Sequence, residues 1–296
     1  MSETSTISDT PKIPDKIFVV PYRDRESHKT IFSHYMTHLL EGQNYEIYYI
    51  EQNDERHFNR GALKNIGFMV GKEKYPNHYR NITFIFHDID LLPYKRDLFN
   101  YECKLKEPSH FYGFKFLLGG IVAMKGEDFY RINGYPNYWA WGWEDNALQR
   151  RFDLRIKGKI NRSEFLPINH ENVLNYYHGW DRITSPTNQK QFQQEYEDGN
   201  IYSGIHSLKN IKKHIIQDPD YERIKKIRVD FFLTEFPEQQ YEYFKETMWE
   251  LEGRLQREMK QKNRKNKNFK ELGKIKGGIN HFGKFDMLFY LNNNKK

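Results

Sequence analysis

Apolar and polar positions follow two different periods in the first third of the chain. Three short runs rich in β-branched and aromatic residues predict buried strands at residues 16–21, 45–52 and 82–87. Between them, apolar side chains recur at helical spacing over residues 28–40, with Ser27 as a candidate cap, and again after Phe58-Asn59-Arg60. This alternation of strands and helices is typical of an α/β protein with a parallel sheet between helices.

After Pro93 the regular alternation of elements ends. The pattern predicts further strands at residues 111–116, 120–124 and 224–233, short helices at 126–132 and 189–196, a helix at 144–156 and a long amphipathic helix at 238–259. Residues 161–198 are polar and predict mainly loop. We therefore expect a lead-in at residues 1–15, a catalytic domain at 16–235, and a C-terminal helix with a basic tail at 236–296.

Composition indicates a folded protein with a large core. Of 296 residues, 29% are charged and 16% are aromatic, which is not the composition of a disordered chain. Cys103 is the only cysteine, so no intramolecular disulfide is expected, and a reducing compartment is favoured. No apolar run is long enough for a transmembrane helix, and the polar N-terminus has no signal-peptide pattern. We expect a soluble, cytoplasmic protein.

The positive charge belongs to the C-terminal tail. The net charge is +7, and residues 250–296 hold 13 Lys and Arg against 5 Asp and Glu, a surplus of eight. Such a tail binds nucleic acid or anionic membrane in some proteins, but it is more often a solvated surface. Charge alone therefore does not predict nucleic-acid binding for the nearly neutral body.

The segment at residues 137–151, NYWAWGWEDNALQRR, combines four large aromatic side chains with Glu144 and Asp145. Aromatic faces stack on sugar rings, and a neighbouring carboxylate accepts a proton or binds hydroxyls. The alternative is a buried aromatic cluster followed by ordinary acids in the first turn of a helix. The segment by itself leaves both interpretations open.

Asp88 and Asp90 directly follow the third predicted strand, and Arg23 and Arg25 follow the first. Ligands bind beyond the carboxyl ends of strands in open α/β sheets, which favours a functional interpretation of both pairs. Paired carboxylates suit a divalent cation, and arginine suits a diphosphate. An Asp-x-Asp pair alone is weak evidence, and surface ion pairs are the alternative for the arginines.

Five motifs in one order resemble the β-1,4-galactosyltransferase family, with its PFRNR, FNRAKLLNVGF, FxDVDLIP, INGFPN and WGWGGEDDD patterns. They are Pro21-Tyr22-Arg23-Asp24-Arg25, Phe58-Asn59-Arg60, Asp88-Ile89-Asp90-Leu91-Leu92-Pro93, Ile132-Asn133-Gly134-Tyr135-Pro136 and Trp139-Ala140-Trp141-Gly142-Trp143-Glu144-Asp145. The resemblance covers about residues 16–194. It implies a type A, Rossmann-like fold with a mixed, mostly parallel sheet flanked by helices. It also implies transfer of a sugar from a UDP-sugar, with inversion and with Mn²⁺.

The resemblance also implies roles for individual residues. The expected donor contacts are Pro21, Arg23, Arg25, Phe58, Arg60, Asp88, Leu117, Gly120 and Trp141. Asp145 is in the place of the catalytic base, beside Glu144, and both belong to the acceptor side with Trp139 and Trp141. Trp141 matches the tryptophan of a loop that closes over both substrates.

For the metal, the resemblance implies Asp90 and His178, because His178-Gly179-Trp180-Asp181-Arg182 fits the family's H-x-R-D-K pattern better than His170 does. A further family ligand falls at Asn175 or Tyr176, and neither residue matches it well. An oxygen ligand there would allow Mg²⁺ as well as Mn²⁺.

Several residues depart from the family pattern. Trp143 replaces a glycine and Asn146-Ala147 replaces trailing aspartates, so the acceptor pocket is expected to differ. Leu117 stands where many galactose-transferring members have tyrosine, which favours N-acetylgalactosamine as readily as galactose. Eukaryotic members are anchored Golgi enzymes with disulfides, so a cytosolic setting, in a bacterium or in the host of a large virus, fits this chain better.

Two alternatives stay open beside a UDP-sugar transferase acting on a sugar or glycan. One is another metal-dependent nucleotide-sugar or nucleotidyl transferase that uses the same Asp-x-Asp pair. The other is a carbohydrate- or nucleic-acid-binding module on a decayed transferase scaffold. The presence of Asp90, Glu144 and Asp145 argues against decay. The acceptor, the linkage and the oligomeric state are not predicted.

Overall fold

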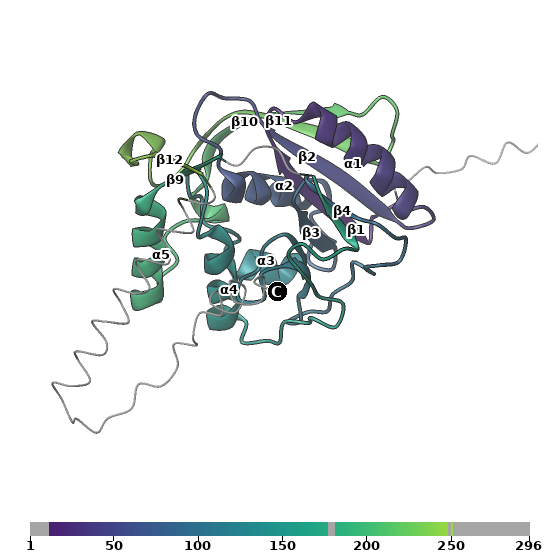
Figure 1. Ribbon diagram of the computed structural model, residues 1–296, viewed down its shortest axis with the longest axis horizontal. Helices are drawn as coiled ribbons and strands as arrows, with labels where there is room; N and C mark the ends of the chain where they lie inside the picture. Colours follow the sequence, from purple (N-terminus) through teal and green to yellow (C-terminus); the bar gives the residue numbers. More distant parts are fainter. Residues whose placement is uncertain (1–11, 177–180, 248–249, 251–296) are drawn as a thin grey trace, which may run out of the picture.

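An eight-stranded mixed sheet lies at the centre of the computed structural model, which describes residues 12–176, 181–247 and Glu250 (Figure 1). The helices are α1 (Glu26–Leu39), α2 (Arg60–Lys74), α3 (Gly126–Arg131), α4 (Glu144–Arg155) and α5 (Pro186–Asp198), with short 3-10 turns η1 (Ile205–Ser207) and η2 (Glu238–Gln240). The strands are β1 (Lys16–Tyr22), β2 (Tyr45–Gln52), β3 (Thr83–His87), β4 (Leu91–Pro93), β5 (Ser109–Gly113), β6 (Ile121–Lys125), β7 (Leu166–Pro167), β8 (Val173–Asn175), β9 (Asp181–Thr184), β10 (Lys209–Gln217), β11 (Ile224–Leu233) and β12 (Phe244–Thr247).

The central strand β1 is buried on both faces. Ile17 and Val19 pack into the core on the side of α2, α3 and α4, and Phe18 and Val20 pack on the side of α1. Successive side chains of a strand point to opposite faces, so a continuous apolar run is what a sheet covered on both faces requires. This two-sided burial confirms the α/β fold with helices on both faces of the sheet.

The parallel strands place their carboxyl ends on the same side of the molecule. The sheet order is β10-β11-β2-β1-β3-β6-β5-β7, and β1, β2, β3 and β11 run parallel. Strand β6 is antiparallel to β3, so the residues that precede Ile121 lie at the same edge as the residues that follow His87. The loops after β1, β2 and β3 and the loop before β6 therefore meet; the strand pattern had predicted this only for the residues after β1 and β3.

The first three strands and two helices match the predicted ranges closely, but two local predictions were wrong. Helix α1 begins at Glu26, and its N-cap is Arg25 without a side-chain capping bond, so Ser27 is not the cap. The strand expected at residues 111–116 is β5, which ends at Gly113 because Phe114–Leu117 form a turn, with the Leu117 amide donating to the Phe114 carbonyl.

The polar stretch at residues 161–198 has more structure than predicted. It holds β7, β8 and β9, and α5 begins at Pro186, where the Ser185 hydroxyl accepts from the Thr187 amide. Strand β10 was not predicted, because its lysine-rich sequence KNIKKHIIQ has no apolar face. It forms by antiparallel pairing with β11 at the edge of the sheet.

The long helix expected at residues 238–259 was wrong over residues 238–247. This segment forms η2 and then β12, which pairs antiparallel with β9. Pairing with a distant strand, and the ion pair of Lys245 with Asp181 at 2.7 Å, outweigh the local helical periodicity. Of residues 248–259, only Glu250 is described.

Both ends of the described chain pack against the sheet domain. The Thr83 amide donates to the Asp15 carbonyl, and the Trp139 indole donates to the Phe236 carbonyl. Packing therefore continues beyond the expected boundaries at residues 15 and 235. The rest of the expected lead-in and of the basic tail lies outside the described residues. Within the described part of the chain, no helix has the length and apolar character needed to cross a bilayer.

Candidate active site

Backbone hydrogen bonds join the loops that lie at the carboxyl ends of the parallel strands. The Asp88 amide donates to the Gly120 carbonyl at 3.2 Å, and the Leu118 amide donates to the Asp145 carbonyl at 3.3 Å. The loop before β6 therefore ties the end of β3 to the first turn of α4. This brings two separate acidic motifs of the sequence into one site.

Side chains from α2 neutralise the acids of this site. Arg60 Nη1 lies 3.4 Å from Glu144 Oε1 and 3.9 Å from Asp88 Oδ2. One turn further along the helix, Lys64 Nζ lies 3.6 Å from Asp88 Oδ1 and 3.9 Å from Asp145 Oδ1. Two cations thus face three carboxylates that come from the end of β3 and the start of α4.

Sequence reasoning predicted Arg60 but missed Lys64. The Lys64 side chain is only 1% exposed, and most other buried positions of α2 are apolar or glycine. The available signal was the spacing, because residues four apart share one face of a helix and Arg60 was already placed in the site. The quoted family motif FNRAKLLNVGF has leucine at the position of Lys64.

Charge and burial shift the pKa values of the aspartates in different directions. Burial alone would raise the pKa of Asp88, but Arg60 and Lys64 hold it below its ordinary value. Burial, followed by the charge of Asp88, raises the pKa of Asp90. Burial raises the pKa of Asp145 to about 7, against the opposing charge of Lys64. A carboxylate with a pKa near neutrality is well suited to proton transfer.

The Asp145 carboxylate is tightly confined. A Cβ on Gly119 would lie 2.2 Å from Asp145 Oδ2, so only glycine leaves room for the carboxylate. The same Cβ would lie 3.1 Å from Leu117 Cδ1, which places Leu117 beside this group. Next to it, Gly120 has φ +74°, and a Cβ there would meet the Tyr112 carbonyl oxygen at 2.4 Å. Gly119 is therefore required by packing against Asp145, and Gly120 by its positive φ and its contact with the Tyr112 backbone.

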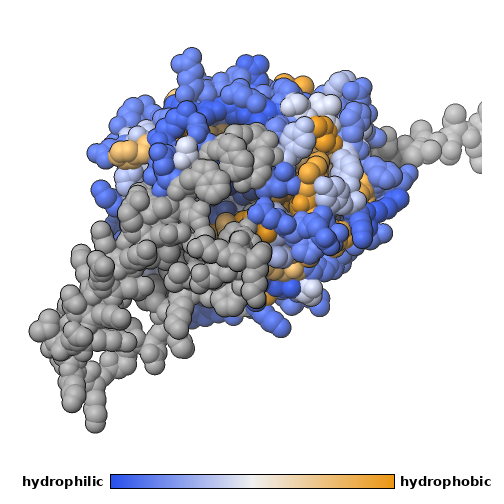
Figure 2. Space-filling view, in the orientation of Figure 1, coloured by the Kyte–Doolittle hydropathy of each residue, from blue (hydrophilic) through white to orange (hydrophobic). Residues whose placement is uncertain are grey.

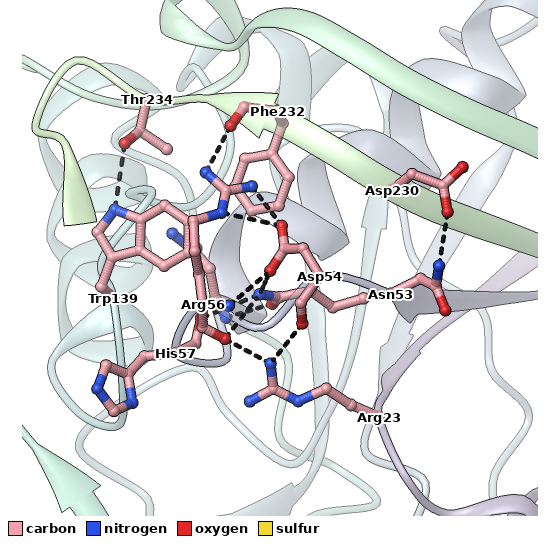
Figure 3. Close-up of polar contacts among 11 residues, drawn as sticks. Arg23, Asn53, Asp54, Arg56, His57, Trp139, Asp230, Phe232 and Thr234 are labelled. Carbon is pink, nitrogen blue, oxygen red and sulfur yellow. Dashed lines mark hydrogen bonds and ion pairs between the residues drawn. The ribbon is translucent and has the colours of Figure 1, made fainter. Parts of the chain in front are cut away.

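The predicted donor residues Arg23 and Phe58 lie together at the end of β1. The Arg23 guanidinium lies 5.6 Å from the centre of the Phe58 ring. It also donates to the carbonyls of Asp54 and Arg56 (Figure 3). The loop after β2 is itself held by Arg56, whose side chain bonds Asp54 and the Phe232 carbonyl (Figure 3). The position of Arg23 thus depends on a well-packed loop.

Arg25 lies in the same region with unused hydrogen-bonding capacity. Its Nη1 atom is buried and has no hydrogen-bond partner among the described residues. Burial lowers the pKa of Arg25 to about 10, partly offset by Asp90. A guanidinium with an unpaired buried donor fits an anionic group such as a phosphate. Pro21, in contrast, is a buried residue of β1 that pairs with Ile50.

The expected acceptor contact of Trp139 does not fit the structure. Its side chain is fully buried and stacks on Phe232 with ring centres 5.3 Å apart (Figure 3). Its indole donates to the Thr234 hydroxyl and the Phe236 carbonyl, and Arg56 lies 4.7 Å from the ring centre. Trp139 is therefore a core residue that supports the loop under Arg23, as the buried-cluster alternative proposed.

The other two tryptophans of the motif are half-buried. The Trp141 amide donates to the Ile183 carbonyl, which attaches this loop to β9. Trp143 has φ +74° and stacks on Phe192 of α5 at 5.1 Å. The Gly142 amide between them donates to Glu144 Oε2 at 3.0 Å, so the loop and the first acid of α4 are positioned together.

Of the predicted metal ligands, only Asp90 is described, because His178 lies outside the described residues. Strand β8 pairs with β4, and the Tyr176 amide donates to the Asp90 carbonyl at 2.6 Å, so the described chain as far as Tyr176 runs beside Asp90. Mutual repulsion of Asp88 and Asp90 fits a divalent cation. No cluster of three or more His, Cys, Asp or Glu that could hold a metal occurs among the described residues.

The residues considered as further ligands have other contacts. Asn175 is in β8, Tyr176 is exposed, and His170 accepts from the Asn172 amide within its own turn. Within the described residues, Tyr176 reaches the Asp90 backbone, and no side chain of these three residues makes an ion pair with Asp88, Glu144 or Asp145.

Two family models match adjacent parts of the chain. Residues 12–104 match the N-terminal region of glycosyl transferase group 7, and residues 100–179 match the N-terminal domain of galactosyltransferase. Together they cover the strands, helices and loops that build the site.

Curated relatives and solved structures agree with these models. β-1,4-Galactosyltransferase 4 of Cricetulus griseus is 35% identical over 158 residues, 49% of this chain and 44% of the relative. β-1,4-Galactosyltransferase 1 of Bos taurus is 35% identical over 156 residues, 48% of this chain and 37% of the relative. The chain thus spans less than half the length of the curated relatives it matches.

The catalytic domain of Drosophila β1,4-galactosyltransferase 7, solved with xylobiose, shares the fold. Its TM-score is 0.56 at 22% identity, covering 77% of this chain and 97% of that chain. A mutant of the same enzyme, solved with manganese, UDP-Gal and xylobiose, has a TM-score of 0.55 at 21% identity.

Proposed function

Because this chain belongs to the β-1,4-galactosyltransferase family, we propose that it transfers galactose or N-acetylgalactosamine from a UDP-sugar to a hydroxyl of a sugar or glycan, with inversion. The observation that carries the proposal is the charged cluster at the carboxyl ends of the parallel strands. It consists of Arg60, Lys64, Asp88, Glu144 and Asp145. There a confined carboxylate, Asp145, lies beside cations that can face an anionic leaving group. This combination suits attack by a hydroxyl on an activated sugar.

In this proposal Asp145 is the general base. Its carboxylate takes the proton of the acceptor hydroxyl as that oxygen forms a bond to the anomeric carbon and the bond to UDP breaks. Glu144 positions the acceptor, and the Gly142 amide and Arg60 hold its carboxylate. Trp141, in the loop attached to β9, covers the sugars.

The donor side of the proposal uses the arginines at the end of β1. Arg25 offers an unpaired buried donor to the diphosphate, and Arg23 with Phe58 forms a platform for the uridine. Asp88 contacts the ribose. Leu117, beside Asp145, leaves room for a 2-acetamido group where a larger aromatic side chain would not.

Asp90 and His178 would hold a divalent cation, Mn²⁺ or in its place Mg²⁺. The neighbouring enzyme that was solved with UDP-Gal also held manganese, which supports this part of the proposal. When bound, such an ion supplies positive charge to the leaving diphosphate. Within the chain, Arg25 and Arg60 supply charge of the same sign.

The experiment that tests this function is UDP release with Mn²⁺ across a panel of UDP-sugars and free mono- and disaccharides, xylobiose among them. The wild type is expected to turn over with UDP-galactose or UDP-N-acetylgalactosamine. Asp90→Asn and Asp145→Asn should each lower kcat by about 10²-fold or more, because one weakens the metal site and the other removes the base.

Two results would change the proposal. Comparable rates with both donors support the role of Leu117, and strict rejection of UDP-N-acetylgalactosamine contradicts it. If the protein neither binds UDP with Mn²⁺ nor releases it from any donor, the transferase function is wrong.

A further inference from the structure

Lys64 is a buried charge in the active site to which the family resemblance gives no role. Its side chain is 1% exposed, and its ammonium lies between Asp88 Oδ1 at 3.6 Å and Asp145 Oδ1 at 3.9 Å. A lysine is rarely buried this completely unless its charge is balanced. Here the balancing groups are two carboxylates of the proposed catalytic site.

The surroundings hold the ammonium in one place. The Tyr135 ring lies on another side, with Lys64 Nζ 4.6 Å from its centre. The preceding turn of α2 places Arg60 in ion pairs with Glu144 and Asp88. Lys64 therefore makes the ion pair with Asp145, and Arg60 adds positive charge from the preceding turn.

The Asp145 carboxylate is confined from two directions. Its Oδ2 atom packs on Gly119, where a Cβ would come within 2.2 Å, and its Oδ1 atom faces Lys64. Oδ1 has no hydrogen-bond partner among the described residues, so this side is held by charge rather than by a fixed hydrogen bond.

We propose that Lys64 is a positioning residue that holds the Asp145 carboxylate, in its charged form, against Gly119 for proton abstraction from the acceptor. The proposal rests on the proposed function, in which Asp145 is the base. Lys64 itself does not touch the reacting atoms.

The charges around Asp145 determine in which direction its pKa changes when Lys64 is replaced. Lys64 and Arg60 face it from α2, Glu144 from α4, Asp88 from the end of β3, and Tyr135 from the loop before α4. Burial raises the pKa of Asp145 to about 7, and Lys64 is the strongest opposing charge. Without Lys64 the pKa of Asp145 must rise. Because the base acts as a carboxylate, activity then begins to fall at a higher pH than in the wild type as the pH is lowered.

The test is the pH dependence of kcat/KM for UDP release from UDP-galactose by the full chain, comparing the wild type with Lys64→Met and Lys64→Arg. Lys64→Met should move the acidic limb upward by about one pH unit or more, with about tenfold lower activity near pH 6.5 and recovery at high pH. Lys64→Arg, which keeps the charge, should leave the limb near its wild-type position.

Lys72→Met is the matched control, because Lys72 is on the same helix and also lies over a tyrosine ring, 4.4 Å from the centre of Tyr130. It should not move the limb. Lys64→Gln replaces Lys64→Met if the latter does not fold, with thermal unfolding as the criterion. An unchanged acidic limb in a folded, uncharged Lys64 variant overturns the role of Lys64. The proposed transferase function still stands in that case if the wild type is active and Asp145→Asn is inactive.

A direct titration separates the two proposals further. Carboxyl ¹³C NMR without substrate, with Asp145 assigned from Asp145→Asn, measures the same pKa even if no donor turns over. An upward shift in Lys64→Met supports the positioning of Asp145 by Lys64, and an unchanged titration refutes it. Absence of turnover by the wild type refutes only the transferase function.

Discussion

At the scale of single residues, the site depends on how little space and solvent surround each charge. Glu144 is 5% exposed, and Asp145 packs on the backbone of Gly119. Burial strengthens the interactions of these carboxylates with Arg60 and Lys64, because the local dielectric is low. It also makes their positions sensitive to a single added carbon atom.

Gly119→Ala tests this confinement. The new Cβ would overlap Asp145 Oδ2 and displace the carboxylate, so kcat should fall by about 10²-fold. Measured in the Asp145→Asn background, the same substitution should cause little additional loss, since the displaced group is already inactive. Equal losses in both backgrounds would show that Gly119 acts through something other than Asp145.

At the scale of elements, a buried ion pair joins the helix that carries the proposed base to α5. Arg151 of α4 donates from Nε to Glu195 Oε1 at 2.6 Å and from Nη2 to Oε2 at 2.8 Å, and its Nη1 donates to the Gly134 carbonyl. Both side chains are almost fully buried. The pair fixes α4 relative to α5, whose Phe192 supports Trp143.

Glu195→Ala should lower the free energy of unfolding by about 3–5 kcal/mol, because it leaves the Arg151 guanidinium buried without a counter-charge. Glu197→Ala is the matched control on the exposed side of the same helix, with an expected change within about 0.5 kcal/mol. Urea denaturation measures both. Similar stabilities for the two variants would mean that the ion pair contributes little.

At the scale of the whole molecule, the charged cluster lies within the sheet domain and the excess positive charge lies in the C-terminal tail. The face in Figure 2 is mainly hydrophilic where it is coloured, with apolar residues gathered beside the grey residues and a few isolated ones elsewhere. The described residues therefore already contain the proposed base, the acids around it and the cations that face them.

Removing the residues after Met259 should leave UDP-sugar turnover within about twofold of the full chain, since the site does not require their charge. The alternative of a tail-dependent binding module predicts a loss of partner affinity together with its salt dependence. Turnover measured at low and high salt distinguishes the two. A large loss of activity would show that the tail is required for catalysis.

Local pattern alone determined the first three strands and the first two helices. These elements have apolar periods that each segment expresses by itself, and burial on both faces of β1 and β2 only enforces them. The resemblance carried by the ordered motifs then implied that Arg60, Asp88, Glu144 and Asp145 share a site.

The tertiary structure decided what depends on contacts between distant segments. Strands β10 and β12 exist because of their partners β11 and β9, although their own patterns predict no strand. Trp139 is a core residue because Phe232 and Arg56 enclose it, and Lys64 enters the site because folding places Asp88 and Asp145 beside it. Such contacts join residues far apart in the chain, so no local period records them.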